Sequence, residues 1–120
     1  MCYEIIPTPK FEEDLDYYER KRKFKHIEDD VDKAIEKIEE GILVGDAMFD
    51  IKLPDGEDAY KVRAVNTDTK SGKSNGYRII YYAIKNDKTV YLLTVYYKKD
   101  NNRIPTKKEI CNIIKKYCEE

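Results

Sequence analysis

The sequence has a single histidine, His26, three cysteines and no long apolar run. A membrane-spanning helix needs about 20 mostly apolar residues, so we expect no membrane partner. The opening segment MCYEIIPTPK lacks the basic and then apolar pattern of a secretory signal peptide. We therefore expect a cytoplasmic protein.

The few histidine and cysteine residues also limit which metal sites, disulfides and catalytic groups the chain can form. Cys2, Cys111 and Cys118 form no CxxC pair and have no histidine near them in sequence, which argues against a disulfide framework and a zinc site. We interpret Cys111 and Cys118 as packing residues of a helix. A lone His26 excludes a nuclease that uses two histidines as acid and base, and we interpret it as a helix-end residue.

No known motif for a metal or a nucleotide is present. The acidic residues within 28–32 fall in the first turns of an expected helix, where carboxylates stabilise the helix end. The glycine-broken segment GKSNG at 72–76 leads into a strand and not into a helix, so it is no phosphate loop. We expect no metal and no other cofactor.

The formal net charge of −1 conceals a strong division along the chain. Residues 1–59 carry nine Lys or Arg against eighteen Asp or Glu, a balance of −9, whereas residues 60–108 carry twelve against three, a balance of +9. Such asymmetry favours a surface that binds a polyanion, although solvated helices also separate charge.

Two helices are predicted near the start of the chain. Thr8 is suited to cap the first and Pro9 to its first position, and apolar residues recur along one face within 11–18. A second apolar stripe runs over 27–38 and ends at Gly41. The short basic link between them predicts an antiparallel helical hairpin.

Strand-forming runs follow. Tyr3–Ile6 reads as an opening strand, and 60–66, 77–85 and 89–98 read as three more, the last two joined by a hairpin turn at Asn86-Asp87. The stretch 41–58 is expected to be irregular.

A final helix is predicted from Thr106, whose pairing with Glu109 forms a capping box. At this length we expect one domain over residues 1–120, of class α+β. It should have a small, largely antiparallel sheet, with the N-terminal hairpin and the C-terminal helix packed on one of its faces.

Cations recur at the ends of the predicted strands. Lys61 and Arg63 lie two residues apart and so project from one face of a strand, and Arg78 begins the next strand. The last strand ends in two tyrosines followed by two lysines, at Tyr96, Tyr97, Lys98 and Lys99. If these strands are neighbours, one basic patch results.

The loop before Arg78 extends this charge through Lys70 and Lys73, and Gly72 and Gly76 are expected to allow its tight turns. Arginine binds phosphate oxygens in a planar fork and aromatic rings stack on unpaired bases, so RNA is the ligand that the mixture favours. Strand ends also carry Lys and Arg merely as solvated residues that prevent aggregation. The residues alone leave both interpretations open.

Three segments follow one another in the chain, YKVRAV, GKSNGYRIIYY and TVYLLTVYYKK, with two predicted helices before them and one after them. This order resembles the RelE/ParE superfamily of toxins from toxin–antitoxin systems, and within it RelE-like toxins of the HigB type. The resemblance spans nearly the whole chain. It implies a ribosome-dependent endoribonuclease that cuts translated mRNA by metal-free attack of a ribose 2′-hydroxyl and is silenced by a cognate antitoxin.

The resemblance also implies roles for individual residues. Lys61 matches the general base, with Arg63 holding charge beside it, and Arg78 matches the arginine that stabilises the phosphorane. Lys98 falls where the family often has an arginine that contacts phosphate or protonates the leaving group. Lys70, Lys73, Lys99 and the two tyrosines at 96 and 97 are expected to bind RNA.

The chain departs from the family in two places. Residues 101–105 contain no tyrosine, whereas many RelE-type members have a functional one after this strand. Position 98 holds lysine, a weaker bidentate phosphate ligand than arginine. Two other hypotheses therefore stay open: a ParE-like inhibitor of DNA gyrase without nuclease activity, and an inactive RNA-binding or regulatory module on the same fold.

Overall fold

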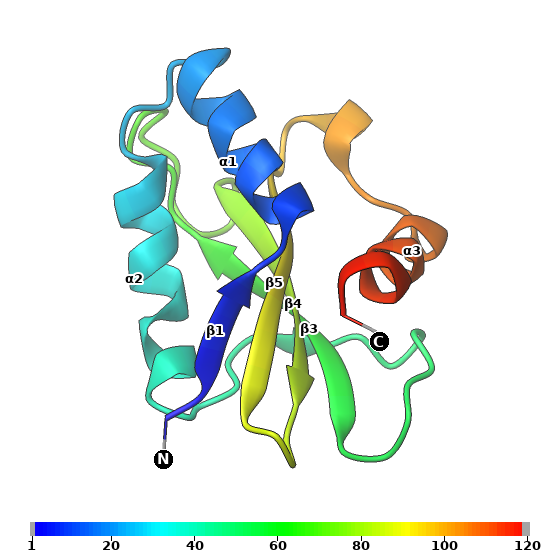
Figure 1. The fold of residues 1–120 in the computed structure, drawn as a ribbon. Helices are drawn as coiled ribbons and strands as arrows, with labels where there is room; N and C mark the ends of the chain where they lie inside the picture. The colour runs from blue at the N-terminus through cyan, green and yellow to red at the C-terminus, as the bar shows by residue number, and fades with distance from the viewer. Residues whose placement is uncertain (1, 119–120) are drawn as a thin grey trace.

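The computed structural model describes residues 2–118 and has a five-stranded sheet in the order β1-β5-β4-β3-β2, with helices on both faces (Figure 1). The strands are β1 (Glu4–Pro7), β2 (Asp46–Ala47), β3 (Glu57–Ala64), β4 (Tyr77–Ile84) and β5 (Thr89–Tyr97). The helices are α1 (Pro9–Arg20), α2 (Ile27–Glu39), the short 3-10 helix η1 (Asn101–Arg103) and α3 (Lys107–Tyr117). The prediction of an α+β fold is confirmed.

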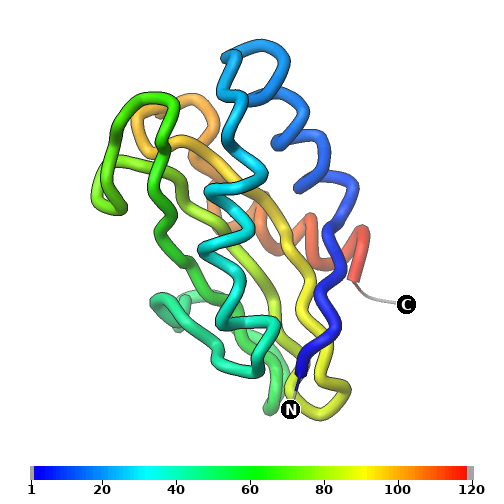
Figure 2. Tube along the Cα trace, turned by 90° about the vertical axis from the view of Figure 1, so that its left-hand side faces the viewer, coloured from blue at the N-terminus to red at the C-terminus, as the bar shows by residue number. Residues whose placement is uncertain are grey.

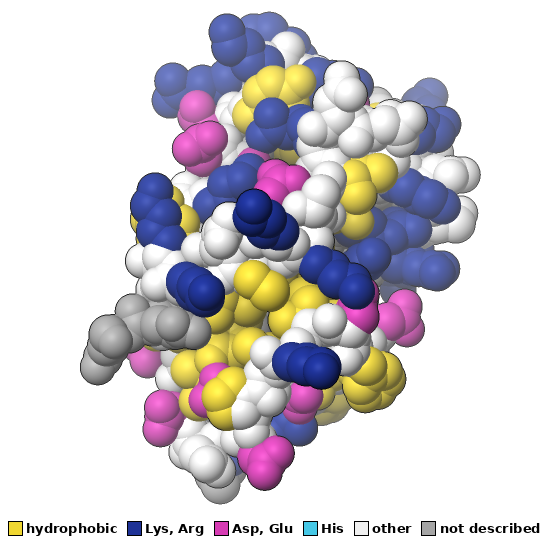
Figure 3. Space-filling view, turned by 90° about the vertical axis from the view of Figure 1, so that its right-hand side faces the viewer, with side chains coloured by type: hydrophobic (Ala, Val, Ile, Leu, Met, Phe, Trp, Pro, Cys, Tyr) yellow, Lys and Arg dark blue, Asp and Glu magenta, His cyan; other side chains and the backbone are white. Residues whose placement is uncertain are grey.

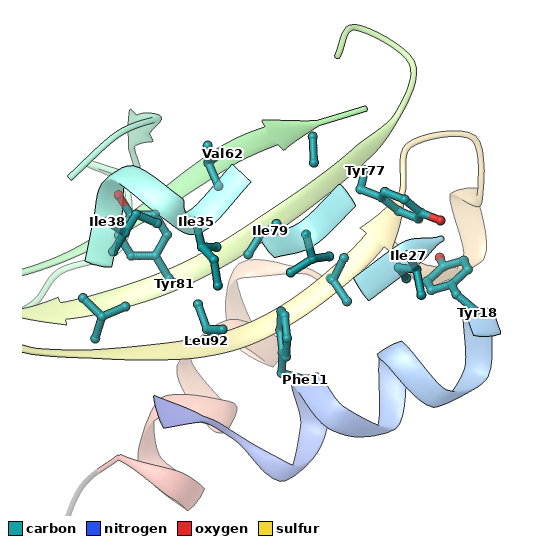
Figure 4. Packing of buried hydrophobic residues seen from close by; sticks show 14 of the residues in the cluster. Phe11, Tyr18, Ile27, Ile35, Ile38, Val62, Tyr77, Ile79, Tyr81 and Leu92 are labelled. Carbon is teal, nitrogen blue, oxygen red and sulfur yellow. The ribbon is translucent and has the colours of Figure 1, made fainter. Parts of the chain in front are cut away.

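α1 and α2 cover one face of the sheet, as expected for the N-terminal hairpin (Figures 1 and 2). Every second residue of β4 points toward them, including Tyr77, Ile79 and Tyr81. Phe11 and Tyr18 of α1 and the apolar stripe of α2 close this layer (Figure 4). The stripe that the sequence spacing predicts is thus the surface that each helix buries.

α3 lies on the opposite face, so the expectation that all helices pack on one face is wrong. Its residues Ile110, Ile113 and Ile114 bury against the other alternate residues of the central strands, among them Ile80 and Tyr82. The spacing of apolar residues shows which side of a helix is buried, but it does not show which face of a sheet receives it. β4 is consequently buried on both faces over nearly its whole length.

Strand pairing differs from the prediction in two details. β1 pairs in parallel with β5, whereas the other pairs are antiparallel, so the sheet is mixed. Asp46–Ala47, inside the stretch expected to be irregular, pairs with β3 at the edge of the sheet. Such a two-residue strand has no sequence periodicity to reveal it.

Both predicted helix caps are confirmed. The hydroxyl of Thr8 accepts a hydrogen bond from the amide N–H of Phe11 at 3.3 Å. Thr106 and Glu109 form the capping box, each side chain accepting from the other residue's amide N–H at 3.1 Å. Among residues 2–118 no helix is long and apolar enough to cross a membrane.

Asp14 of α1 is a buried carboxylate that joins three separate segments, with 1% of its side chain exposed. It accepts from Lys10 Nζ at 2.5 Å and from Arg103 Nη2 at 2.9 Å. It also accepts from the hydroxyl of Thr94 and, at 3.4 Å, from the amide of Val95. A buried charge is tolerated only where its hydrogen-bonding capacity is filled. Asp14 therefore needs its partners in η1 and β5, and the bonds to them hold both segments against α1.

We predict that Asp14→Ala lowers the free energy of unfolding by about 3 kcal/mol, because it leaves the hydroxyl of Thr94 and the guanidinium of Arg103 without their acceptor. Asp16→Ala is the matched control, since Asp16 is exposed and its one ion pair among residues 2–118 is with Arg20. It should cost less than about 1 kcal/mol. Urea unfolding of both variants measures the difference, and equal losses would contradict the proposed role of Asp14.

Candidate nucleic-acid interface

Lys61, Arg63 and Arg78 lie on one face of two neighbouring strands. The register of β3 and β4 places Arg63 directly opposite Arg78 and Lys61 directly opposite Ile80. Side chains of directly opposed residues share a face, with Cβ atoms about 4.5–5.5 Å apart. The sheet therefore brings together the three cations that the sequence predicted, and we call them the cationic strip.

α3 shares this face with the cationic strip but covers a different part of it. Ala59 of β3, two residues before Lys61, is buried in the α3 cluster, whereas Lys61 keeps partial exposure and Arg63 is exposed. Figure 3 shows hydrophobic side chains in the middle of the side that carries α3, with Lys and Arg side chains gathered toward its upper right. None of the three cations forms an ion pair within residues 2–118.

Arg78 is buried and already donates three hydrogen bonds to the backbone, although its place at the start of a strand suggested an exposed side chain. Only 7% of the residue is exposed. Its Nη1 donates to the carbonyl of Lys73 at 2.9 Å and to that of Tyr77 at 3.2 Å, and its Nη2 donates to the carbonyl of Ser74 at 3.0 Å. Burial, together with the charge of Arg63 opposite, lowers the pKa of Arg78. The Nε–H and one Nη2–H have no acceptor in the described part of the chain, so they are the donors left for a ligand.

The loop 66–76 is held from two strands. Besides the bonds from Arg78, Lys98 Nζ donates to the carbonyl of Ser74 at 2.9 Å and the Lys98 amide donates to the carbonyl of Gly76 at 2.9 Å. Lys98 thereby lies beside the same loop as Arg78. The exposed side chains of Lys70 and Lys73 extend from the loop, and Lys99 is exposed after β5.

The two tyrosines at the end of β5 point in opposite directions. Tyr96 lies opposite Arg78 on the α3 face, but only 4% of it is exposed and burial raises its pKa. Tyr97 lies on the α1–α2 face with 6% exposed, its ring 5.6 Å from that of Phe24. Neither ring offers an open face for a base, and Tyr97 does not join the cationic strip.

Asp46 is a residue that the sequence reasoning missed. It lies in β2, directly opposite Lys61, and its side chain is exposed. Its negative charge raises the pKa of Arg78, against the larger effect of burial. The sequence offered no signal for it, because the two-residue strand that places it is formed by pairing with β3 and not by a local pattern.

His26 lies away from the strip, at the start of α2, as the sequence reasoning expected. Its backbone N–H and its Nδ1 each lie 2.9 Å from a carboxylate oxygen of Asp68 in the loop 66–76. This hydrogen bond raises the pKa of His26. Within residues 2–118 no three His, Cys, Asp or Glu residues are placed to hold a metal ion. At the strip itself, the carboxylate of Asp46 lies beside the three cations.

The two glycines of the loop differ in what they allow. A Cβ on Gly76 would lie 2.1 Å from the carbonyl oxygen of Ala64, whereas a Cβ on Gly72 would meet nothing within 4 Å. Neither has a positive φ. Gly76 is thus required for close approach of β4 to the end of β3, and the expectation that Gly72 is needed for a tight turn is not supported.

We predict that Gly76→Ala lowers the free energy of unfolding by about 2–3 kcal/mol, because backbone atoms cannot move aside as a flexible side chain can. Gly72→Ala in the same loop should change it by less than about 0.5 kcal/mol. Thermal or urea unfolding compares the two. A Gly76→Ala variant as stable as Gly72→Ala would show that the loop does not pack against β3 in this way.

Comparison of the chain with protein-family models, with curated proteins and with solved structures found no match.

Proposed function

We propose that this protein is a ribosome-dependent endoribonuclease, the toxin of a toxin–antitoxin pair, which cuts translated mRNA at the cationic strip without a metal. One observation carries the proposal: two strands bring Lys61, Arg63 and Arg78 to the same face, at the part that α3 does not cover. The resemblance of the same strands to RelE-like toxins supplies the reaction. A cluster of cations without ion-pair partners favours a ligand with closely spaced negative charges, such as an RNA backbone.

In the proposed reaction, the 2′-hydroxyl of a ribose attacks the adjacent phosphate and the 5′-oxygen of the next nucleotide leaves. In the proposal, the proton of the 2′-hydroxyl is accepted by Lys61, the general base that the resemblance implies, or by the carboxylate of Asp46 opposite it. Arg63 and the two spare donors of Arg78 stabilise the charge of the phosphorane. Lys98 is proposed to contact the phosphate or to protonate the leaving oxygen.

The proposal implies a cognate antitoxin. A helical or acidic segment that covers the cationic strip, or that displaces α3 from Ile80 and Tyr82, would block access to the strip. The ribosome and its mRNA are the other partners in the proposal.

A second candidate function is RNA binding without cleavage. It is favoured by the three hydrogen bonds that Arg78 already donates to carbonyls of Lys73, Ser74 and Tyr77, which leave it fewer donors for a developing charge. A gyrase inhibitor of the ParE type is a third candidate, but the basic strip that is retained here disfavours it.

Cleavage of ribosome-bound mRNA, mapped by primer extension, tests the leading proposal. We expect Lys61→Met and Arg63→Ala to lower the cleavage rate by about 10²–10³-fold, the loss typical of a removed transition-state donor. Lys85→Ala is the control, because Lys85 lies at the other end of β4 in a surface pair with Asp58. Its rate should stay within about twofold of the wild-type rate, since an exposed pair contributes little.

The result that overturns the mechanism is growth arrest with intact transcripts that persists in Arg63→Ala. A supercoiling assay with gyrase then tests the ParE-like function. If RNA binds and neither ribosomal nor free RNA is cut, the binding function replaces the proposal.

A further inference from the structure

The linker between α1 and α2 carries cations that the proposed function does not use. Lys21, Lys23 and Lys25 are exposed, and none of them forms an ion pair in the described structure. The linker lies beside the loop 66–76 at the upper end of the molecule, near η1 (Figure 1). These lysines therefore lie at the same end of the molecule as the cationic strip.

The linker has a fixed shape. Nη1 of Arg22 donates to both carboxylate oxygens of Asp100, at 2.6 and 2.7 Å. The guanidinium carbon of Arg22 lies 5.1 Å from the ring centre of Phe24 and 5.8 Å from that of Tyr97. Lys23 has a left-handed backbone with φ 61°. The buried face of the linker is thus anchored, and its lysines are presented outward from a defined backbone.

Two open hollows lie side by side here, of which the larger adjoins the linker, and both are lined by Tyr17 and Arg103. The larger, of about 750 Å³, is lined by Glu13, Asp16, Tyr17, Arg20, Lys21, Lys23 and Arg103. The smaller, of about 340 Å³, is lined by Tyr17, Lys99, Asp100, Asn101, Asn102 and Arg103. The guanidinium of Arg103 stacks over the ring of Tyr17 between the two hollows, with 3.8 Å between the guanidinium carbon and the ring centre. We call the two hollows together the groove; it extends from the end of β5 to the linker.

The charges along this groove favour an anion. Most of its carboxylates are already in ion pairs, Asp16 with Arg20 and Asp100 with Arg22. The lysines Lys21, Lys23 and Lys99 have no such partner, and Glu13 is the opposing carboxylate without one in the described structure. Binding sites for small molecules enclose most of their ligand. This shallow groove does not, and it fits an extended chain of phosphates better.

The end of β5 connects the groove to the cationic strip. Lys98 donates to the carbonyl of Ser74, which also accepts from Arg78, and the next residue, Lys99, lines the smaller hollow. We propose that a single RNA strand bound at the strip continues over the end of β5 into this groove, where its phosphates contact Lys99, Lys21 and Lys23. The identity of the ligand rests on the proposed function, whereas the position of the groove does not.

The salt dependence of RNA binding tests the proposal. The double variant Lys21→Gln, Lys23→Asn removes two charges and keeps the backbone, because asparagine tolerates the left-handed conformation at position 23. The control is a second double variant on α2, with the substitutions Lys33→Gln and Lys37→Gln. It loses the same charge from two exposed lysines that lie outside the groove. The probe is a labelled single-stranded oligoribonucleotide of about 16 nucleotides, followed by anisotropy between about 50 and 200 mM salt.

Each phosphate contact to a single strand contributes about 0.7 to the slope of log K against log salt concentration. We expect the linker variant to lower the steepness of this slope by about 1.4 and the control to leave it unchanged. In ribosomal cleavage the linker variant should raise KM and leave kcat within about twofold, because it contacts RNA away from the reacting phosphate.

Equal slopes for the linker variant and the control overturn the proposal, even if Arg63→Ala weakens RNA binding. A reduced slope for the linker variant supports it, even if the wild-type protein cuts no mRNA and the proposed catalytic function fails. If poly-glutamate displaces the oligonucleotide from the wild type but not from the linker variant, the groove binds acidic protein, which overturns its assignment to RNA. No binding by the wild type at about 50 mM salt overturns both the groove and the strip as RNA sites.

Discussion

The guanidinium of Arg78 organises the upper end of this protein, because it is bonded to its own strand and to the loop before it. Three of its N–H groups donate to the carbonyls of Lys73, Ser74 and Tyr77. A buried guanidinium is stable only when such donors find acceptors. The loop 66–76 is consequently fixed against β4, and the same residue that shapes the loop presents its remaining donors beside Arg63.

The division of charge in the sequence becomes a division in space. α1 and α2, which carry much of the acidic segment, cover one face of the sheet, and the cationic strip lies on the other beside α3. Around the end of β5, the basic linker and Lys98–Lys99 continue the positive surface to the α1 side. The electrostatic potential near a surface depends on the charges close to it and not on the net charge of the chain. A protein with a net charge of −1 can therefore have a local surface suited to a polyanion.

Local signals in the sequence predicted the parts of this structure that depend on neighbours in sequence. The caps at Thr8 and Thr106, the apolar stripes of the helices and the shared face of Lys61 and Arg63 all follow from spacing within a few residues. Features that depend on distant pairing were missed.

Those missed features have a common physical cause, since the free energy that fixes them comes from contacts between segments far apart in the chain. β1 runs parallel to β5, α3 crosses to the second face, and Asp46 lies opposite Lys61. The burial of Tyr97 belongs to the same class, because the linker residues Arg22 and Phe24 that contact its ring are distant in sequence. Tyr96 is buried in the cluster that includes Ile110 and Ile113 of α3, on the face that spacing did not assign to this helix. Spacing alone suggested exposed stacking residues there.

The most direct test is an NMR titration of the arginine side-chain Nε–H signals with a single-stranded oligoribonucleotide. Arg63 and Arg78 should shift as RNA binds, because their Nε–H groups have no acceptor in the described structure. The backbone amide signals of Lys33 and Lys37 on α2, which lie outside both the strip and the groove, should shift little and serve as the internal reference. RNA binding that leaves the signals of Arg63 and Arg78 unchanged would contradict the assignment of the cationic strip as the RNA site.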